Sequence, residues 1–219
     1  MATVAMIPPR TIPPSTKRDT PGTMLSPGAI AQPTKRQRSP PEMSPLLFLR
    51  SIFGSAGLVN TTSPKSFMKP TEEEIQAYDL EVVRTIRMGD LEKLQQLYND
   101  GKNLNASNQF GESLLHMACR RGNVDILKFM LREAKVRVDR QDDFGRNPLH
   151  DACWTSSPNY AVMDELLQFV DPFLLLAEDV RGSTPFDYVR RNHWKGWVNY
   201  LRTRQEQIQE RIRQVQEGL

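Results

Sequence analysis

Apolar residues recur at helical spacing from residue 76 onward, and short polar breaks divide them into helix-length segments. Leu80–Leu97 is the first such stretch, and Gly89 with Asp90 splits it into two helices joined by a tight turn. The pattern predicts a series of paired helices that ends near residue 201. No apolar run approaches the 18 residues of a membrane-spanning helix, so we expect a soluble protein with no membrane contact.

The paired helices repeat with a nearly constant period, which is typical of stacked-repeat architectures. His116 and His150 occupy matching positions in two aligned copies and are 34 residues apart. A further copy is marked by Gly182, which lies 37 residues after Gly145. A more divergent unit begins at Leu80. The sequence therefore predicts about four related units.

The second copy reads Gly-Arg-Asn-Pro-Leu-His-Asp-Ala over residues 145–152. This resembles the ankyrin repeat, whose signature is Gly-x-Thr-Pro-Leu-His-x-Ala. The resemblance implies an all-α fold, an ankyrin-repeat α-solenoid of about four helix pairs over residues 71–201. Residues 1–70 are then a disordered arm, and residues 202–219 form a C-terminal helix.

The start of each copy has a local explanation. We expect Asn147 or Thr184 to accept hydrogen bonds from the first free amides of the helix. Pro148 or Pro185 suits the first helical position, because its fixed φ is already helical and its missing N–H is not needed there. Gly145 supplies the tight turn that precedes them.

Two His-x-x-Cys pairs contain the atoms of a zinc site: His116 with Cys119, and His150 with Cys153. Equivalent positions in adjacent repeats are about 8–10 Å apart, whereas zinc needs each ligand atom within about 2.0–2.3 Å. We therefore expect no metal. The ankyrin resemblance implies that each histidine ties neighbouring loops together by hydrogen bonds, and we expect each cysteine to be buried as a small apolar residue.

Catalytic patterns are missing from the sequence. There is no glycine-rich phosphate loop, and no pair of carboxylates has a setting that would separate their pKa values. His150, Asp151 and Cys153 share one helical turn, but adjacent residues on a helix do not face each other. We expect no enzyme activity and no cofactor.

Composition separates the arm from the repeats. Residues 1–70 hold 12 of the 16 prolines and 9 basic against 2 acidic residues, whereas residues 71–219 hold 20 basic against 24 acidic residues. The arm cannot bury enough apolar surface to offset its ordering entropy. We expect residues 1–70 to be dispensable for folding. Within the arm, Lys35–Arg38 resembles a nuclear-localisation signal, and a solvated basic tail is the alternative.

Two apolar segments outside the repeats allow two interpretations each. Leu46–Phe53 is either a short motif that folds onto a partner or a segment that packs back on the repeat domain. Residues 202–219 carry apolar residues at heptad-like spacing, and they either lie against the last repeat or dimerise. We expect a monomer.

The ankyrin resemblance also places the partner-contacting positions, which lie on the loop tips and first helices of a concave face. In this sequence the positions are Gln109, Phe110, Glu112, Arg120, Arg121, Asp143, Phe144, Arg146, Trp154, Thr155, Val180, Arg181, Ser183, Arg191 and Asn192. Five arginines stand against two acids on this face, while residues 71–219 have a net charge of −4. Aromatic residues beside arginines are typical of interface hot spots. We therefore expect a protein partner with an acidic segment.

The resemblance implies a non-catalytic scaffold for protein–protein interaction, and our leading hypothesis is an intracellular adaptor or regulator. The alternative is a nuclear regulator whose basic arm contacts nucleic acid while the repeats hold a second protein. In both cases we expect a cytoplasmic or nuclear location.

Overall fold

The computed structural model describes residues 42–57 and 69–218. These residues form α-helices and three short 3-10 helices, with no strand among them. The elements before the repeats are α1 (Pro45–Ser55) and α2 (Glu72–Gln76). The repeat helices are α3 (Leu80–Met88), α4 (Leu91–Asn99), α5 (Leu114–Arg121), α6 (Val124–Arg132), α7 (Pro148–Cys153) and α8 (Tyr160–Leu166). They are followed by η1 (Pro172–Leu176), η2 (Pro185–Tyr188), η3 (Arg191–His193), α9 (Trp194–Thr203) and α10 (Gln205–Glu217).

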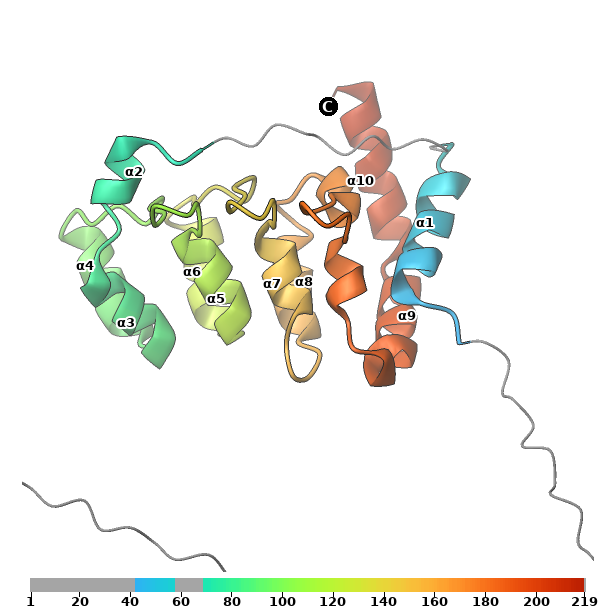
Figure 1. The fold of residues 1–219 in the computed structure, drawn as a ribbon, viewed down its shortest axis with the longest axis horizontal. Helices are drawn as coiled ribbons and strands as arrows, with labels where there is room; N and C mark the ends of the chain where they lie inside the picture. The colour runs from blue at the N-terminus through green and yellow to red at the C-terminus, as the bar shows by residue number, and fades with distance from the viewer. Residues whose placement is uncertain (1–41, 58–68, 219) are drawn as a thin grey trace, which may run out of the picture. The chain divides into compact units, whose positions relative to one another are not determined.

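The helices stack in pairs, as the sequence predicted (Figure 1). The first helices form one layer, in which α3 contacts α5, α5 contacts α7, and α7 contacts η2. The second helices form the other layer, in which α4 contacts α6 and α6 contacts α8. The described core is one cluster of apolar side chains that runs along the stack. The predicted α-solenoid of about four helix pairs is confirmed.

The turn inside a pair depends on glycine. Gly89 and Gly122 have φ of 75° and 73°, a left-handed conformation in which a Cβ atom is strained. Asn123 and Asn159 cap the second helices, and their side chains also donate hydrogen bonds to the carbonyl oxygens of Gly89 and Gly122, at 3.4 and 2.8 Å. The N-cap asparagine of the second helix in the next unit thereby holds each turn in place. This link between units was not predicted from the sequence.

The predicted helix starts are largely confirmed. The side chain of Asn147 accepts hydrogen bonds from the amides of Leu149 and His150, and Pro148 occupies the first turn. Thr184 differs, because its hydroxyl and its amide both donate to the carboxylate of Asp187, at 2.9 and 2.8 Å. The fourth unit opens with the short 3-10 helix η2 and not with an α-helix.

Helix α1 belongs to the folded unit, and this corrects the boundary of the arm. It packs against α9, α10 and η2, at the opposite end of the stack from α2 (Figure 1). Its side chains Leu49, Ile52 and Phe53 are at most 1% exposed, and the Phe53 ring contacts Phe173 at 5.8 Å between centroids. The sequence left two interpretations of Leu46–Phe53 open, and the structure has the segment packed on the domain. Because α1 is buried in this way, we expect residues 1–41, and not the whole of residues 1–70, to be dispensable for folding.

Helix α10 also lies against the domain. Ile208 and Ile212 are buried against α1 and η1, whereas Val215 is 40% exposed. This agrees with the interpretation in which the C-terminal helix packs on the last repeat. None of the described helices is long and apolar enough to cross a membrane. The basic segment Lys35–Arg38 lies outside the described residues.

Candidate functional site

Three tight turns, at residues 108–112, 142–146 and 179–183, precede the first helices of the second, third and fourth units, and we call them the hairpin tips. One Asn or Asp side chain stabilises each tip. The side-chain oxygens of Asn108, Asp142 and Asp179 each accept hydrogen bonds from two backbone amides of the tip, at 2.8–3.0 Å. Such a side chain fixes a tight turn. The sequence analysis missed these residues, although their spacings of 34 and 37 residues repeat those of the glycines.

The tips are joined to each other by backbone hydrogen bonds. The amide of Asp143 donates to the carbonyl of Phe110 at 2.8 Å, and the amide of Val180 donates to the carbonyl of Phe144 at 2.9 Å. Phe110 and Phe144 nevertheless keep their rings in solvent, with 55% and 46% of the residue exposed. Two large aromatic side chains are thus held in fixed positions without a core to cover them.

A pocket of about 480 Å³ lies between the second and third units, and we call it the aromatic pocket. It brings together seven of the residues that the sequence placed at the contact face. Its lining consists of Asn108, Phe110, Glu112, Arg120, Asp142, Asp143, Phe144, Arg146 and Trp154. Pockets lined by aromatic side chains with a few fixed polar groups are typical binding sites.

Arg146 is held rigidly in the aromatic pocket. Its guanidinium donates two hydrogen bonds to Asp142, at 2.8 and 2.6 Å, and lies over the rings of Phe144 and Trp154 at 5.0 and 5.8 Å from their centroids. Burial lowers the pKa of Arg146, but the hydrogen bonds and charge of Asp142 outweigh this effect and the pKa is raised overall. The side chain therefore acts as a charged, flat wall between two rings.

Arg120 is also fully engaged. It donates to both carboxylate oxygens of Asp151, at 3.1 and 3.2 Å, and forms a second ion pair with Glu112 at 2.7 Å. Asp151 is 2% exposed. Two of the five predicted arginines are therefore neutralised by Asp142 and Asp151, which the sequence-based charge count left out. The excess of positive charge on the face is smaller than predicted.

A second pocket of about 320 Å³ adjoins the first, and we call it the polar pocket. It shares Arg120 and Trp154 with the aromatic pocket and extends along the loop between α7 and α8. The lining is Arg120, Arg121, Gly122, Trp154, Thr155, Ser156, Ser157, Pro158 and Asn159. Trp154, at the start of this loop, is 51% exposed.

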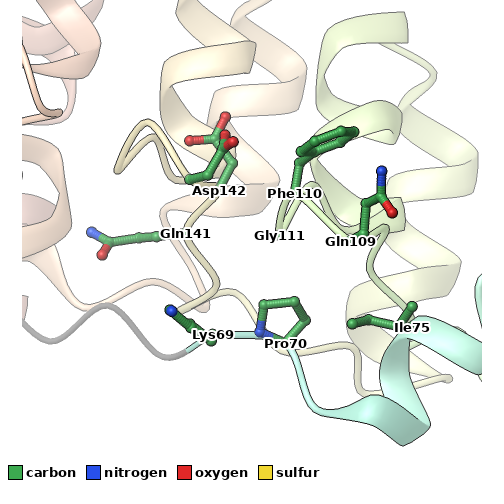
Figure 2. Close-up of a pocket in the computed structure, with 9 residues that line it drawn as sticks. Lys69, Pro70, Ile75, Gln109, Phe110, Gly111, Gln141 and Asp142 are labelled. Atoms are coloured by element: carbon green, nitrogen blue, oxygen red, sulfur yellow. The ribbon is translucent and has the colours of Figure 1, made fainter.

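The remaining predicted residues lie outside these two pockets. Gln109 lines a third pocket of about 440 Å³, in which two hairpin tips face the segment that leads into α2 (Figure 2). Figure 2 shows one tip with Gln109, Phe110 and Gly111, the next with Gln141 and Asp142, and beneath them Lys69, Pro70 and Ile75. The sequence analysis did not predict that Lys69, Pro70 and Ile75 line a pocket.

The fourth unit supplies five predicted residues, and none of them lines either adjoining pocket. Val180 and Arg181 are exposed on the third tip, and Ser183 lies beside it with its carbonyl bound to His150. The guanidinium of Arg191 lies 5.5 Å from the centroid of the Trp194 ring. Asn192 is exposed next to it.

The histidines and cysteines have structural positions. The Nε2 atom of His116 is 2.9 Å from the carbonyl oxygen of Arg146, and that of His150 is 3.2 Å from the carbonyl oxygen of Ser183, so each ring joins its own unit to the next tip. This confirms the predicted role of the histidines. Burial raises the pKa of both thiols, Cys119 and Cys153, and keeps them protonated.

The comparison with protein families agrees with this architecture. A family model described as ankyrin repeats (3 copies) matches residues 82–174, which span α3 to η1. Residues 82–174 of the chain are ankyrin repeats. Repeats of this family generally mediate protein–protein interaction and are typically non-catalytic.

Curated relatives match over parts of their length. A putative glutaminase 2 of Caenorhabditis elegans is 36% identical over 97 residues, 43% of this chain and 16% of the relative. The tyrosine-protein kinase Shark of Drosophila melanogaster is 35% identical over 81 residues, 37% of this chain and 8% of the relative. The mouse diacylglycerol kinase iota is 29% identical over 143 residues, 64% of this chain and 13% of the relative. The chain thus spans less than a fifth of the length of these relatives.

Proposed function

We propose that this chain is a non-catalytic adaptor or regulator that binds a protein partner through the face made of the hairpin tips and first helices. The aromatic pocket carries the proposal. It gathers exposed rings and an immobilised arginine in one place, and such residues dominate the energy of protein interfaces when a partner excludes water from them.

The energetics favour a partner over solvent at this face. Phe110, Phe144 and Trp154 are each about half exposed, so a partner can still cover a large apolar area. Full burial of a large apolar side chain contributes roughly 1.5–3 kcal/mol. Because Asp142 already orients Arg146, little further side-chain entropy is lost when a partner binds against it.

Affinity capture with the full chain as bait tests the proposal. A double variant, Phe144→Ala with Trp154→Ala, should lose the partners that the wild-type chain captures while remaining folded, since both residues are about half exposed and lie outside the buried core. Lys128→Glu is the matched control, because Lys128 is exposed on α6 and lines neither pocket. Capture of the same partners by the folded double variant would place the interface elsewhere.

Arg146 is unsuitable for this test as a simple surface charge. Its replacement by glutamate would leave Asp142 without its ion pair and would disturb the tip that Asp142 builds. Arg121 and Arg181 are better targets, since both are exposed and form no ion pair with a described residue.

The nuclear alternative depends on residues 1–41, which lie outside the described residues. Titration of duplex DNA at two salt concentrations tests it, because phosphate contacts give an affinity that falls steeply with salt. Absence of binding at low salt would remove this alternative. A cytoplasmic or nuclear location remains part of the proposal and can be tested by imaging a tagged full chain.

A further inference from the structure

We propose that the partner presents a linear segment that is read at two adjoining positions. An apolar side chain of the segment enters the aromatic pocket, and an aspartate or glutamate side chain a few residues away enters the polar pocket and pairs with Arg121. This inference rests on the proposed function and specifies its partner.

The aromatic pocket is suited to one apolar side chain. Phe110, Phe144 and Trp154 form its walls, and the guanidinium of Arg146 presents a flat face between two of these rings. Every charged group in the pocket except Asp143 already has a partner of opposite charge. The pocket therefore offers stacking and apolar contact but little net charge to attract an ion.

The polar pocket has the opposite character. Its lining includes Arg120 and Arg121 together with Ser156 and Ser157, whereas the hydroxyl of Thr155 donates to the carbonyl of Ser157 at 2.8 Å. Arg120 is compensated by two carboxylates, whereas Arg121 is exposed and has no ion pair with a described residue. One uncompensated guanidinium with nearby hydroxyl donors is complementary to an anion.

The charge balance favours a carboxylate over a phosphate. A carboxylate brings one negative charge, which Arg121 can neutralise. A phosphorylated side chain brings roughly two, and its recognition requires a second free cation. Arg120 cannot supply it without giving up Asp151, which would leave a buried carboxylate unpaired.

The arrangement of the two pockets also limits the separation of the two side chains and determines which pocket each one enters. Arg120 and Trp154 line both pockets, so a continuous chain can reach both. An extended segment advances about 3.3 Å per residue, so the two side chains should be separated by only a few residues. Asp143 is exposed and lines the aromatic pocket on the side of the tip. Its negative charge disfavours the reverse arrangement, in which the acidic residue of the segment would enter the aromatic pocket.

Selection from a phage-displayed library of random peptides on the immobilised full chain tests the inference. We expect enriched peptides to share an aromatic or aliphatic residue and an acidic residue at a constant short separation. A synthetic peptide from this set is then titrated against wild-type, Arg121→Glu, Lys128→Glu and Phe144→Ala chains. Arg121→Glu should weaken binding about tenfold, since an attractive ion pair with the peptide is replaced by repulsion, and Lys128→Glu should not.

A version of this peptide with glutamine in place of its acidic residue completes a double-mutant cycle with Arg121→Glu. It should bind wild-type and Arg121→Glu chains equally, which assigns the tenfold effect to this one pair. Equal weakening of both peptides by Arg121→Glu would overturn the pairing with Arg121. Tighter binding of a peptide with phosphoserine in place of its acidic residue would also overturn it. Failure to enrich any peptide would overturn the linear segment. The proposed function fails only if capture of intact partners survives the loss of Phe144 and Trp154.

Discussion

The two ends of the repeat stack are closed in different ways. At the start, α2 has no buried residue, and polar contacts hold it: its Glu74 forms an ion pair with Arg140, and the carbonyl of Glu74 accepts from the amide of Ser107 at 3.1 Å. At the other end, α1 and α10 cover the fourth unit with apolar side chains such as Phe53 and Ile212. The difference predicts that α1 and α10 contribute more to the stability of the array than α2 does.

The largest expected effect comes from removing α1. Deleting residues 1–57 exposes the apolar surface that Leu49, Ile52 and Phe53 cover, at roughly 1.5–3 kcal/mol for each side chain. We expect a loss of about 5 kcal/mol in the free energy of unfolding, measured by urea denaturation. Deleting residues 1–41 is the matched control and should change little, because α1 is retained. An equally stable 58–219 chain would show that α1 contributes nothing to this end.

A point variant in α10 should have a smaller effect at the same end. Ile212→Ala creates a cavity between α10 and its neighbours, and we expect a loss of about 3 kcal/mol. Val215→Ala, one turn further along and 40% exposed, should cost less than about 1 kcal/mol. Similar losses for the two variants would contradict the burial pattern of α10.

The end of the stack that carries α2 should lose stability when the charge of Glu74 is removed. Glu74→Gln leaves the guanidinium of Arg140 buried without its carboxylate, and we expect a loss of about 2 kcal/mol. The adjacent exposed residue gives the control, Glu73→Gln, with no measurable change. A neutral result for Glu74→Gln would mean that α2 rests on the stack without stabilising it.

Acidification should lower the free energy of unfolding through His150, which lies in the third unit, whereas the first unit contains no histidine. Burial lowers the pKa of His150 below the value of about 6.5 that it has in the unfolded chain, and this outweighs the opposing hydrogen bond to Ser183 and the nearby acids. The unfolded state therefore binds the proton more tightly. The stabilising contribution of neutral His150 is complete above pH 6.5 and is lost as the pH falls toward the folded-state pKa.

The slope of this loss cannot exceed about 1.4 kcal/mol per pH unit for one group. Urea denaturation at pH 7.0 and 5.5, compared between wild-type and His150→Asn chains, measures the contribution. His193→Asn is the control, since His193 is only partly buried. If the two variants show the same pH dependence, His150 is not the responsible group.

Periodic features of the stack were predictable, and contacts between distant segments were not. The spacing of His116 and His150 predicted the units, and the resemblance to ankyrin repeats implied the hydrogen bonds by which each histidine joins its own unit to the next. The apolar pattern of Leu46–Phe53 predicted burial but not its place, since Phe173 is 120 residues away from Phe53 in the sequence. The partner of Arg120 was missed for a similar reason: Asp151 belongs to a different helix.

The position of α1 has a consequence for how the protein acquires its fold during synthesis. Ser55 of α1 accepts a hydrogen bond from Gln209 of α10 at 2.8 Å, across 154 residues of sequence. The ribosome makes the apolar face of α1 before its binding surface on α9 and α10. While the intervening residues are translated, at about 5–20 residues per second, this face is available to chaperones. The closing contact can form only after α10 has left the exit tunnel.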